Sequence, residues 1–132
     1  MDIKILLVDD EIDFVETMAK RFGIRKMPID TAKSGQEALD ALATRAYDVV
    51  ILDVRMPGMD GLETLRQIRE KNPLTEVIML TGHASLEAGM QGMNLGAYDY
   101  VLKPADFDDL LDKVRKAFER KELNAKARKQ GG

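Results

Sequence analysis

Chemically useful side chains come directly after four of the short apolar runs in this sequence of 132 residues. Carboxylates follow the first and third runs, a hydroxyl follows the fourth, and an amine follows the fifth. In chain order these residues are Asp9, Asp10 and Glu11, then Asp53, then Thr81, and then Lys103. If the runs are parallel strands, their carboxyl ends lie along one edge of a sheet, where the active sites of such sheets collect. We therefore expect these side chains to meet.

Carboxylates that meet at one point repel each other unless some are protonated or a cation is present. A set of oxygen ligands suits Mg²⁺ better than it suits a soft metal. Phosphoryl transfer needs a magnesium ion beside a carboxylate, an ammonium group and a hydroxyl, because the cations neutralise the phosphoryl oxygens while the carboxylate attacks phosphorus. The residues alone therefore suggest a Mg²⁺-dependent acceptor of a phosphoryl group.

The strands that would position these residues are short and rich in β-branched side chains. We predict strands at residues 3–8, 28–32, 49–52, 77–80 and 98–102. Nearly continuous apolar runs are typical of strands that are buried on both faces of a parallel sheet. Pro28 places its strand at an edge of the sheet, because proline cannot donate to a neighbouring strand.

Longer amphipathic stretches between the runs predict helices. They cover residues 12–22, 35–45, a stretch through Leu62 and Ile68 that stops at Asn72-Pro73, residues 85–95, and a clear apolar stripe over 107–118. Ser34 and Glu37 have the spacing of a capping box, and Gly96 fits a helix C-terminus. Five strand–helix repeats predict one doubly wound α/β domain over residues 1–120. The polar residues 121–132 are expected to be a solvated helix end that frays, or alternatively the start of a linker.

Composition excludes several classes of protein. The sequence has no cysteine, which excludes disulfides, thiolate chemistry and cysteine zinc sites, and its one histidine, His83, excludes a multi-histidine metal centre. A net charge of −3 argues against direct binding to nucleic acid or acidic lipid. The run Ile5–Val8 is too short for a membrane span or a signal peptide. We expect a soluble cytoplasmic protein with no membrane partner.

Four motifs give the sequence a specific resemblance to the receiver domain of two-component response regulators over residues 3 to about 120. The motifs are Leu6-Leu7-Val8-Asp9-Asp10-Glu11, Asp53 with Met56-Pro57-Gly58 after it, Thr81-Gly82, and Tyr100-Val101-Leu102-Lys103-Pro104. The resemblance implies a flavodoxin-like fold, with five helices around a five-stranded parallel sheet in the order 2-1-3-4-5. It also implies a protein that is not an enzyme, beyond catalysing its own phosphorylation and dephosphorylation.

The resemblance implies that Asp53 is the phosphorylation site, which receives its phosphoryl group from a histidine kinase or a phosphotransfer protein. Asp10 and Asp53 would bind Mg²⁺ directly, and Asp9 would hold a metal-bound water. The backbone carbonyl of Arg55 would complete the ligands that the protein supplies. As an alternative, Asp9 or Asp10 could merely cap the helix that follows.

The same family suggests how the signal would be passed on. Lys103 would pair with the phosphate through a cis Lys103-Pro104 bond, Thr81 would move toward it, and Tyr100 would turn inward, although a purely structural role for Tyr100 competes with this. Arg55 and His83 stand at positions that tune access of water to the phosphoryl group. Because Arg55 is bulky and cationic, we predict slow to moderate self-dephosphorylation.

The output surface would be the fourth helix, fifth strand and fifth helix, acting on an unknown downstream protein as a monomer or as a phosphorylation-dependent dimer. Gly89 and Gly92 in the fourth helix either allow close packing on the sheet or make a helix that is easily reshaped. The loop 53–62 is similar to that of receivers attached to enhancer-binding ATPases, so the chain could be a fragment of a longer transcriptional regulator.

Three other classes of protein were weighed against this interpretation. A flavodoxin-like electron carrier needs a phosphate loop where this chain has acidic residues. A haloacid-dehalogenase-type phosphatase needs an aspartate where Arg55 stands, and a cap domain for which the chain has no room. A receiver that acts as an interaction module without phosphate usually lacks part of the set formed by the acids, Thr81 and Lys103.

Overall fold

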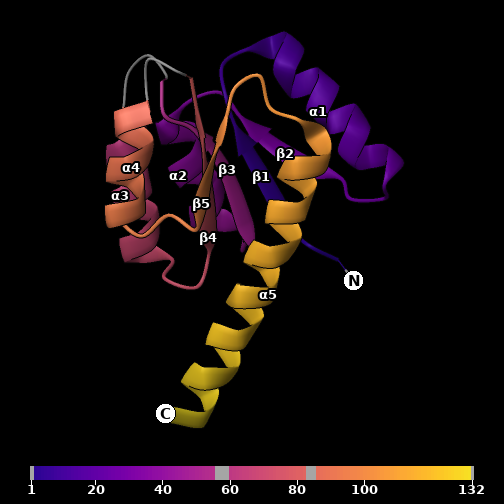
Figure 1. Ribbon diagram of the computed structural model, residues 1–132. Coiled ribbons are helices and arrows are strands. Elements are labelled where there is room, and N and C mark those ends of the chain that lie inside the picture. Colours follow the sequence, from indigo (N-terminus) through magenta and orange to yellow (C-terminus); the bar gives the residue numbers. More distant parts are fainter. Residues whose placement is uncertain (1, 56–59, 83–85, 132) are drawn as a thin grey trace.

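The computed structural model describes residues 2–55, 60–82 and 86–131, and it consists of one parallel sheet with helices on both faces. The strands β1 (Ile5–Val8), β2 (Ile29–Ala32), β3 (Val49–Asp53), β4 (Glu76–Thr81) and β5 (Asp99–Leu102) pair in the order β2-β1-β3-β4-β5. The predicted flavodoxin-like strand order is therefore confirmed (Figure 1).

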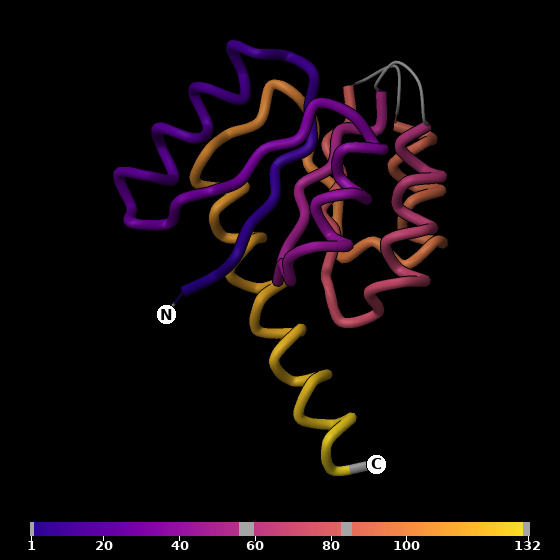
Figure 2. Tube along the Cα trace, turned by 180° about the vertical axis from the view of Figure 1, so that it is seen from behind, coloured from indigo at the N-terminus to yellow at the C-terminus, as the bar shows by residue number. Residues whose placement is uncertain are grey.

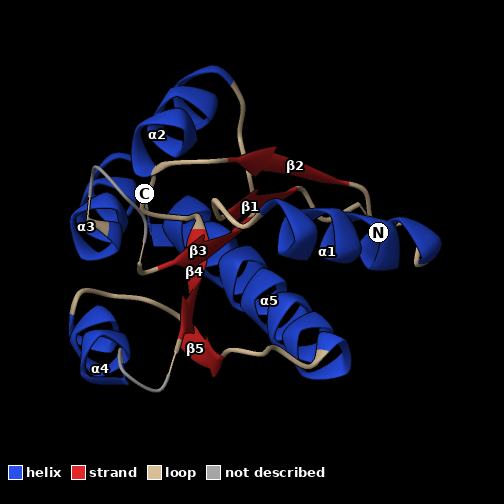
Figure 3. Cartoon of the chain, turned by 90° about the horizontal axis from the view of Figure 1, so that it is seen from above, coloured by secondary structure: helices blue, strands red, loops and turns tan. Residues whose placement is uncertain are grey.

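Five helices connect the strands and cover the sheet. They are α1 (Ile12–Ile24), α2 (Gly35–Thr44), α3 (Gly61–Lys71), α4 (Leu86–Asn94) and α5 (Phe107–Gly131). Seen from above, α1 and α5 lie on one face of the sheet, whereas α2, α3 and α4 lie on the other (Figure 3). This is the doubly wound arrangement that the repeating strand–helix pattern predicts.

The sheet separates two hydrophobic cores, because successive side chains of a strand point to opposite faces. Ile5 and Leu7 of β1 pack in the core that includes Phe22 of α1 and Leu110 of α5. Leu6 and Val8 pack in the other core, which includes Leu65 and Ile68 of α3. Burial on both faces explains why β1 is a continuous apolar run.

The helix ends follow the sequence signals, with one local difference. The Ser34 side chain accepts a hydrogen bond from the Glu37 backbone N–H at 3.1 Å, whereas the Glu37 side chain accepts from the N–H of Lys33 at 3.3 Å rather than from that of Ser34. At the end of α4, Gly96 has a φ of +101°, and the N–H of Ala97 bonds to the carbonyl of Gly92 at 3.0 Å. This is the left-handed helix terminus that favours glycine.

The solvated helix end expected after residue 120 is confirmed, whereas the expected fraying is wrong, because α5 continues without a break to Gly131. Residues 121–130 include Lys, Glu, Leu, Ala, Arg and Gln, which are all good helix formers and need little tertiary contact to stay helical. The last turns of α5 project away from the rest of the chain (Figure 2).

A buried carboxylate ties α5 to the sheet at the edge opposite to Asp53. Glu76, the first residue of β4, is 1% exposed, and its two oxygens accept hydrogen bonds from Arg120 of α5 at 2.8 and 2.9 Å. Arg69 of α3 lies 3.6 Å from the same carboxylate, and the Arg120 guanidinium lies over the Tyr98 ring at 4.6 Å. The hydrogen bonds to Glu76 raise the pKa of Arg120, although burial opposes them. The buried charge is therefore fully paired.

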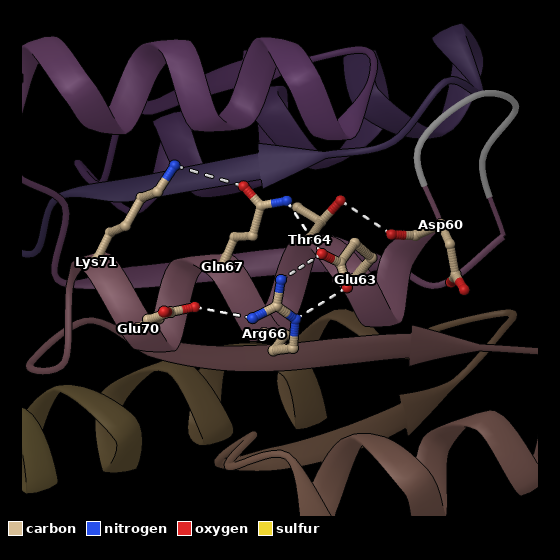
Figure 4. A network of polar contacts seen from close by, with 7 residues as sticks. All are labelled: Asp60, Glu63, Thr64, Arg66, Gln67, Glu70 and Lys71. Atoms are coloured by element: carbon tan, nitrogen blue, oxygen red, sulfur yellow. Dashed lines mark hydrogen bonds and ion pairs between the residues drawn. The ribbon is translucent and has the colours of Figure 1, made fainter.

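An arginine on the surface of α3 makes pairs of a different kind. Arg66 lies between Glu63, at 2.6 Å, and Glu70, at 2.9 Å (Figure 4). Hydrogen bonds from Arg66 and then Gln67 lower the pKa of the Glu63 carboxyl to about 2. Because these side chains are exposed to water, such pairs contribute little to global stability.

We expect Arg120→Met to lower the free energy of unfolding by about 1–2 kcal/mol, because Glu76 would stay buried but lose two hydrogen bonds to a charged group. Urea denaturation followed by circular dichroism measures the change. Arg66→Met is the matched control: it also removes an arginine that contacts glutamate, but from an exposed surface, and should leave stability unchanged. An Arg120→Met protein as stable as the wild type would contradict this role for the buried pair.

Candidate functional site

The carboxyl ends of β1, β3, β4 and β5 bring the expected side chains to one edge of the sheet. Asp53 is the last residue of β3 and Thr81 the last of β4, while Asp9 and Lys103 directly follow β1 and β5. The Lys103 ammonium lies 2.7 Å from Asp9 Oδ2 and 3.5 Å from Asp53 Oδ2. Residues that are 94 positions apart in the sequence are thus in direct contact. The Lys103-Pro104 bond is cis, as the resemblance implies.

Two buried aspartates are held in place by backbone groups of the loops that follow them. Asp9 Oδ1 accepts a hydrogen bond from the Glu11 N–H at 2.9 Å, and Asp53 Oδ1 accepts from the Arg55 N–H at 3.1 Å. The second oxygen of each carboxylate faces Lys103. The N-cap of α1 is Glu11, so neither Asp9 nor Asp10 caps this helix, and the capping alternative is wrong.

The acidic residues suit a small, hard cation. Asp9, Asp10 and Asp53 each offer a carboxylate oxygen, and these oxygens lie within 4.8 Å of one another. Lys103 supplies one positive charge against these carboxylates and that of Glu11, so negative charge is in excess. Oxygen ligands with this charge fit Mg²⁺. The predicted contribution of the Arg55 carbonyl stays a prediction.

Burial and the neighbouring charges set the ionisation of the two central groups. Burial raises the pKa of the Asp53 carboxyl, the Arg55 N–H opposes this, the charge of Asp9 raises it further, and Lys103 lowers it. Burial alone would lower the pKa of the Lys103 amine, but hydrogen bonds to Asp9 and Glu11 outweigh burial and raise it. The amine therefore stays charged, and a bound cation would favour the ionised form of Asp53.

Thr81 is fully buried at the end of β4, and its hydroxyl has no hydrogen-bond partner among residues 2–55, 60–82 and 86–131. Buried hydroxyls are nearly always bonded, so an unpaired one at the end of a strand calls for a functional explanation. This observation agrees with the predicted movement of the Thr81 hydroxyl toward a phosphoryl group on Asp53, although it does not test that movement.

The two predicted switch residues lie against α4 at Gly89. A Cβ atom at Gly89 would lie 3.1 Å from the Thr81 methyl carbon and 3.5 Å from the Tyr100 ring. A Cβ at Gly92 would lie 3.3 Å from Met79 of β4. These contacts confirm that the glycines let α4 pack closely on the sheet. An easily reshaped α4 stays a prediction, which hydrogen exchange would test.

The structure does not test the roles predicted for Arg55, His83 and the loop residues 56–59. Arg55 is exposed, and its backbone N–H, rather than its side chain, contacts Asp53. His83 lies outside the described residues, as do residues 56–59 of the loop motif. Their predicted roles stay predictions.

Two residues to which the family resemblance gives no individual role also contact Lys103. The Glu11 carboxylate lies 2.7 Å from the Lys103 ammonium, and the Phe14 ring centre lies 4.7 Å from it. Glu11 belongs to the acidic group after β1, so its charge was visible in the sequence. Its meeting with Lys103 at this edge of the sheet was expected, whereas the spacing of the chain contains no signal that α1 would carry Phe14 to the lysine.

The comparisons with known proteins agree with this geometry. The family described as "Response regulator receiver domain" matches residues 5–115. The DNA-binding transcriptional regulator NtrC of Klebsiella pneumoniae is 39% identical over 111 residues, which are 84% of this chain and 24% of that protein. The transcriptional regulatory protein ZraR of Escherichia coli O157:H7 is 37% identical over 119 residues, which are 88% of this chain and 26% of that protein.

Solved structures give the same result. The receiver domain of NtrX from Brucella abortus has a TM-score of 0.83 and 34% identity, and the match covers 88% of this chain and 98% of that one. The chain spans about a quarter of the length of the curated relatives it matches. Among the described residues, no helix is both long enough and apolar enough to span a membrane.

We expect Thr81→Val to raise the free energy of unfolding by about 1 kcal/mol, because valine keeps the shape of threonine and removes a buried hydroxyl that has no partner in the described part of the chain. Thr75→Val is the matched control. The Thr75 hydroxyl donates to the Tyr47 carbonyl at 2.8 Å, so this variant should be destabilised by about the same amount. Thermal and urea unfolding would measure both changes, and equal signs for the two variants would contradict an unpaired Thr81 hydroxyl.

Proposed function

The chain belongs to the response regulator receiver domain family, and on this premise we propose that Asp53 accepts a phosphoryl group from a histidine kinase or a phosphotransfer protein, in a Mg²⁺-dependent reaction. The observation that carries the proposal is the position of Lys103, whose ammonium contacts the buried carboxylates of Asp9 and Asp53 from another strand end. A salt bridge that only stabilised the fold would not need a further carboxylate, Asp10, beside it.

The proposed reaction uses the two oxygens of Asp53 differently. The Arg55 N–H holds Oδ1, which leaves Oδ2, on the side of Lys103, to attack phosphorus. The new bond joins this oxygen to phosphorus, the bond from phosphorus to the donor's imidazole nitrogen breaks, and its electron pair stays with that nitrogen, which takes up a proton.

The neighbouring residues would stabilise the transferred group. The Lys103 ammonium would pair with the phosphoryl oxygens, and the Thr81 hydroxyl would find a hydrogen-bond acceptor there after moving from its buried position. A magnesium ion held by Asp9, Asp10 and Asp53 would supply further neutralisation of charge. The protein would act only on its own side chain, so we do not propose an enzyme with an external substrate.

The face formed by α4 and β5 supports the proposed output. Exposed apolar side chains gather on this face; they are Leu86, Met90, Met93, Leu95 and Leu102. An exposed apolar surface of this kind is typical of a site for another protein. We propose a downstream protein partner in the cytoplasm, and a chain that forms one part of a longer regulator is equally compatible with the relatives.

We expect the wild-type protein to gain the mass of one phosphoryl group when incubated with acetyl phosphate and Mg²⁺, and to gain none without Mg²⁺. Asp53→Asn should abolish the gain, because an amide oxygen is a poor nucleophile at phosphorus. Asp48→Asn is the matched control, since Asp48 precedes the same strand at the opposite edge of the sheet, and it should leave the gain intact. Intact-mass spectrometry measures all three.

Beryllofluoride binding distinguishes the two ways in which that experiment could fail. A protein that binds beryllofluoride but takes no phosphoryl group from acetyl phosphate requires its own kinase. A protein that does neither would contradict the proposed chemistry and favour a receiver that works without phosphate.

We expect Arg55→Ala to shorten the lifetime of the phosphoprotein several-fold, since the exposed arginine is the cationic side chain closest in sequence to Asp53 and its charge would pair with the phosphoryl group. The decay of the phosphorylated mass after removal of acetyl phosphate measures the lifetime. A lifetime equal to that of the wild type would exclude this protective role.

A further inference from the structure

We propose that Glu11 is a positioning residue that holds the Lys103 ammonium away from Asp53 in the resting protein and so slows phosphorylation. The proposal rests on the proposed function of Asp53. It assigns a regulatory role to a side chain to which the family resemblance gives no individual role.

The Lys103 ammonium lies closer to Asp9 and Glu11 than to Asp53. Its ammonium lies 2.7 Å from Asp9 Oδ2 and 2.7 Å from Glu11 Oε1, but 3.5 Å from Asp53 Oδ2. A lysine ammonium has three N–H donors, and two of them make short, charge-assisted hydrogen bonds to residues other than Asp53. The lysine is thus drawn toward the β1–α1 side of the site, where Phe14 also contacts it.

The Glu11 side chain is available for this contact because its own helix does not use it. Glu11 is the N-cap residue of α1, where a short side chain normally accepts a hydrogen bond from the first turn, yet its carboxylate makes no such bond. The longer glutamate side chain instead reaches Lys103, on the far side of the site. A serine or aspartate at this position would have a shorter side chain, suited to capping α1 rather than to reaching Lys103.

The contact with Glu11 is weak enough to be given up. The Glu11 side chain is 63% exposed, whereas that of Asp9 is fully buried. Water screens the exposed pair, so its free energy is small. A phosphoryl group on Asp53 would bring about two negative charges to the other side of the ammonium and would draw it away from Glu11. Glu11 would therefore delay phosphorylation without preventing it.

The test compares Glu11→Gln with the wild type in acetyl phosphate and Mg²⁺, with intact mass as the measure of rate. We expect phosphorylation of Asp53 to be about two- to fivefold faster, the range that a partly exposed ion pair covers. The affinity for beryllofluoride should rise by the same factor. Asp13→Asn is the matched control, because it removes an exposed acidic group from the first turn of the same helix, and it should change neither quantity.

A double-mutant cycle shows whether the effect passes through Lys103. In a Lys103→Met background, Glu11→Gln should have no further effect on the rate or on beryllofluoride affinity. If the acceleration persisted there, it would come from general charge repulsion of the anionic donor, and the proposal would be overturned. A Glu11→Gln rate equal to or below that of the wild type would also overturn it.

A measurement without metal or phosphodonor tests the contact itself. The ammonium protons of Lys103 should give a resolved NMR signal in the wild type, because hydrogen bonds protect them from exchange, and this signal should broaden in Glu11→Gln but not in Asp13→Asn. An unchanged signal would overturn the proposal. If instead the wild type takes no phosphoryl group and binds no beryllofluoride, the proposed function fails and the inference fails with it.

Discussion

The site depends on one ammonium group placed among carboxylates, whose mutual repulsion it offsets. Lys103 follows β5, an edge strand, while Asp53 and Asp9 belong to β3 and β1, two and three strands away in the sheet. The long lysine side chain passes the end of β4 to reach them, and the two aspartates would repel each other without it. The parallel order of the strands is what makes this contact geometrically available, because it brings all four carboxyl ends to the same edge.

The two ends of the sheet solve the problem of buried charge in opposite ways. At the end where β4 begins, Glu76 is matched by Arg120 and approached by Arg69, so the charge is paired and nothing remains to attract a ligand. At the end where β4 finishes, three carboxylates share Lys103, and the Thr81 hydroxyl lacks a partner among the residues that the structure describes. One end is complete within the protein, and the other is complete only with additional groups. The two clusters differ in whether their polar groups are paired within the protein. This difference, rather than the presence of charge, distinguishes the cluster around Glu76, which stabilises the fold, from the cluster around Asp53, which could bind a ligand.

Much of this could be predicted, because the strands of a doubly wound sheet leave a strong signal. Runs such as Ile5–Val8 are apolar throughout, and the rule that chemistry collects after such runs was sufficient to select Asp53, Thr81 and Lys103. Prediction failed where the outcome depends on how far a side chain reaches. The contact of the Phe14 ring with Lys103 requires the direction in which α1 leaves β1, which no periodicity contains. The solvated end of α5 was expected, but its polar residues without an apolar stripe wrongly suggested fraying, although their intrinsic preference is helical.

The length of α5 has a mechanical consequence. Its N-terminal half is packed into the core through Leu110 and Val114. Arg120 binds to Glu76, so the helix is also held at the end of the sheet where β4 begins. The residues beyond Lys121 extend roughly 15 Å from Arg120, at about 1.5 Å per residue. If α5 tilted by about 10° about Arg120, its C-terminal end would move by about 3 Å, a distance obtained from the same helical rise. Because Phe107 lies at a comparable distance on the other side of Arg120, the packed half of the helix would move by a similar amount. The far end of α5 would therefore transmit a movement of the packed half to whatever the end of the helix holds.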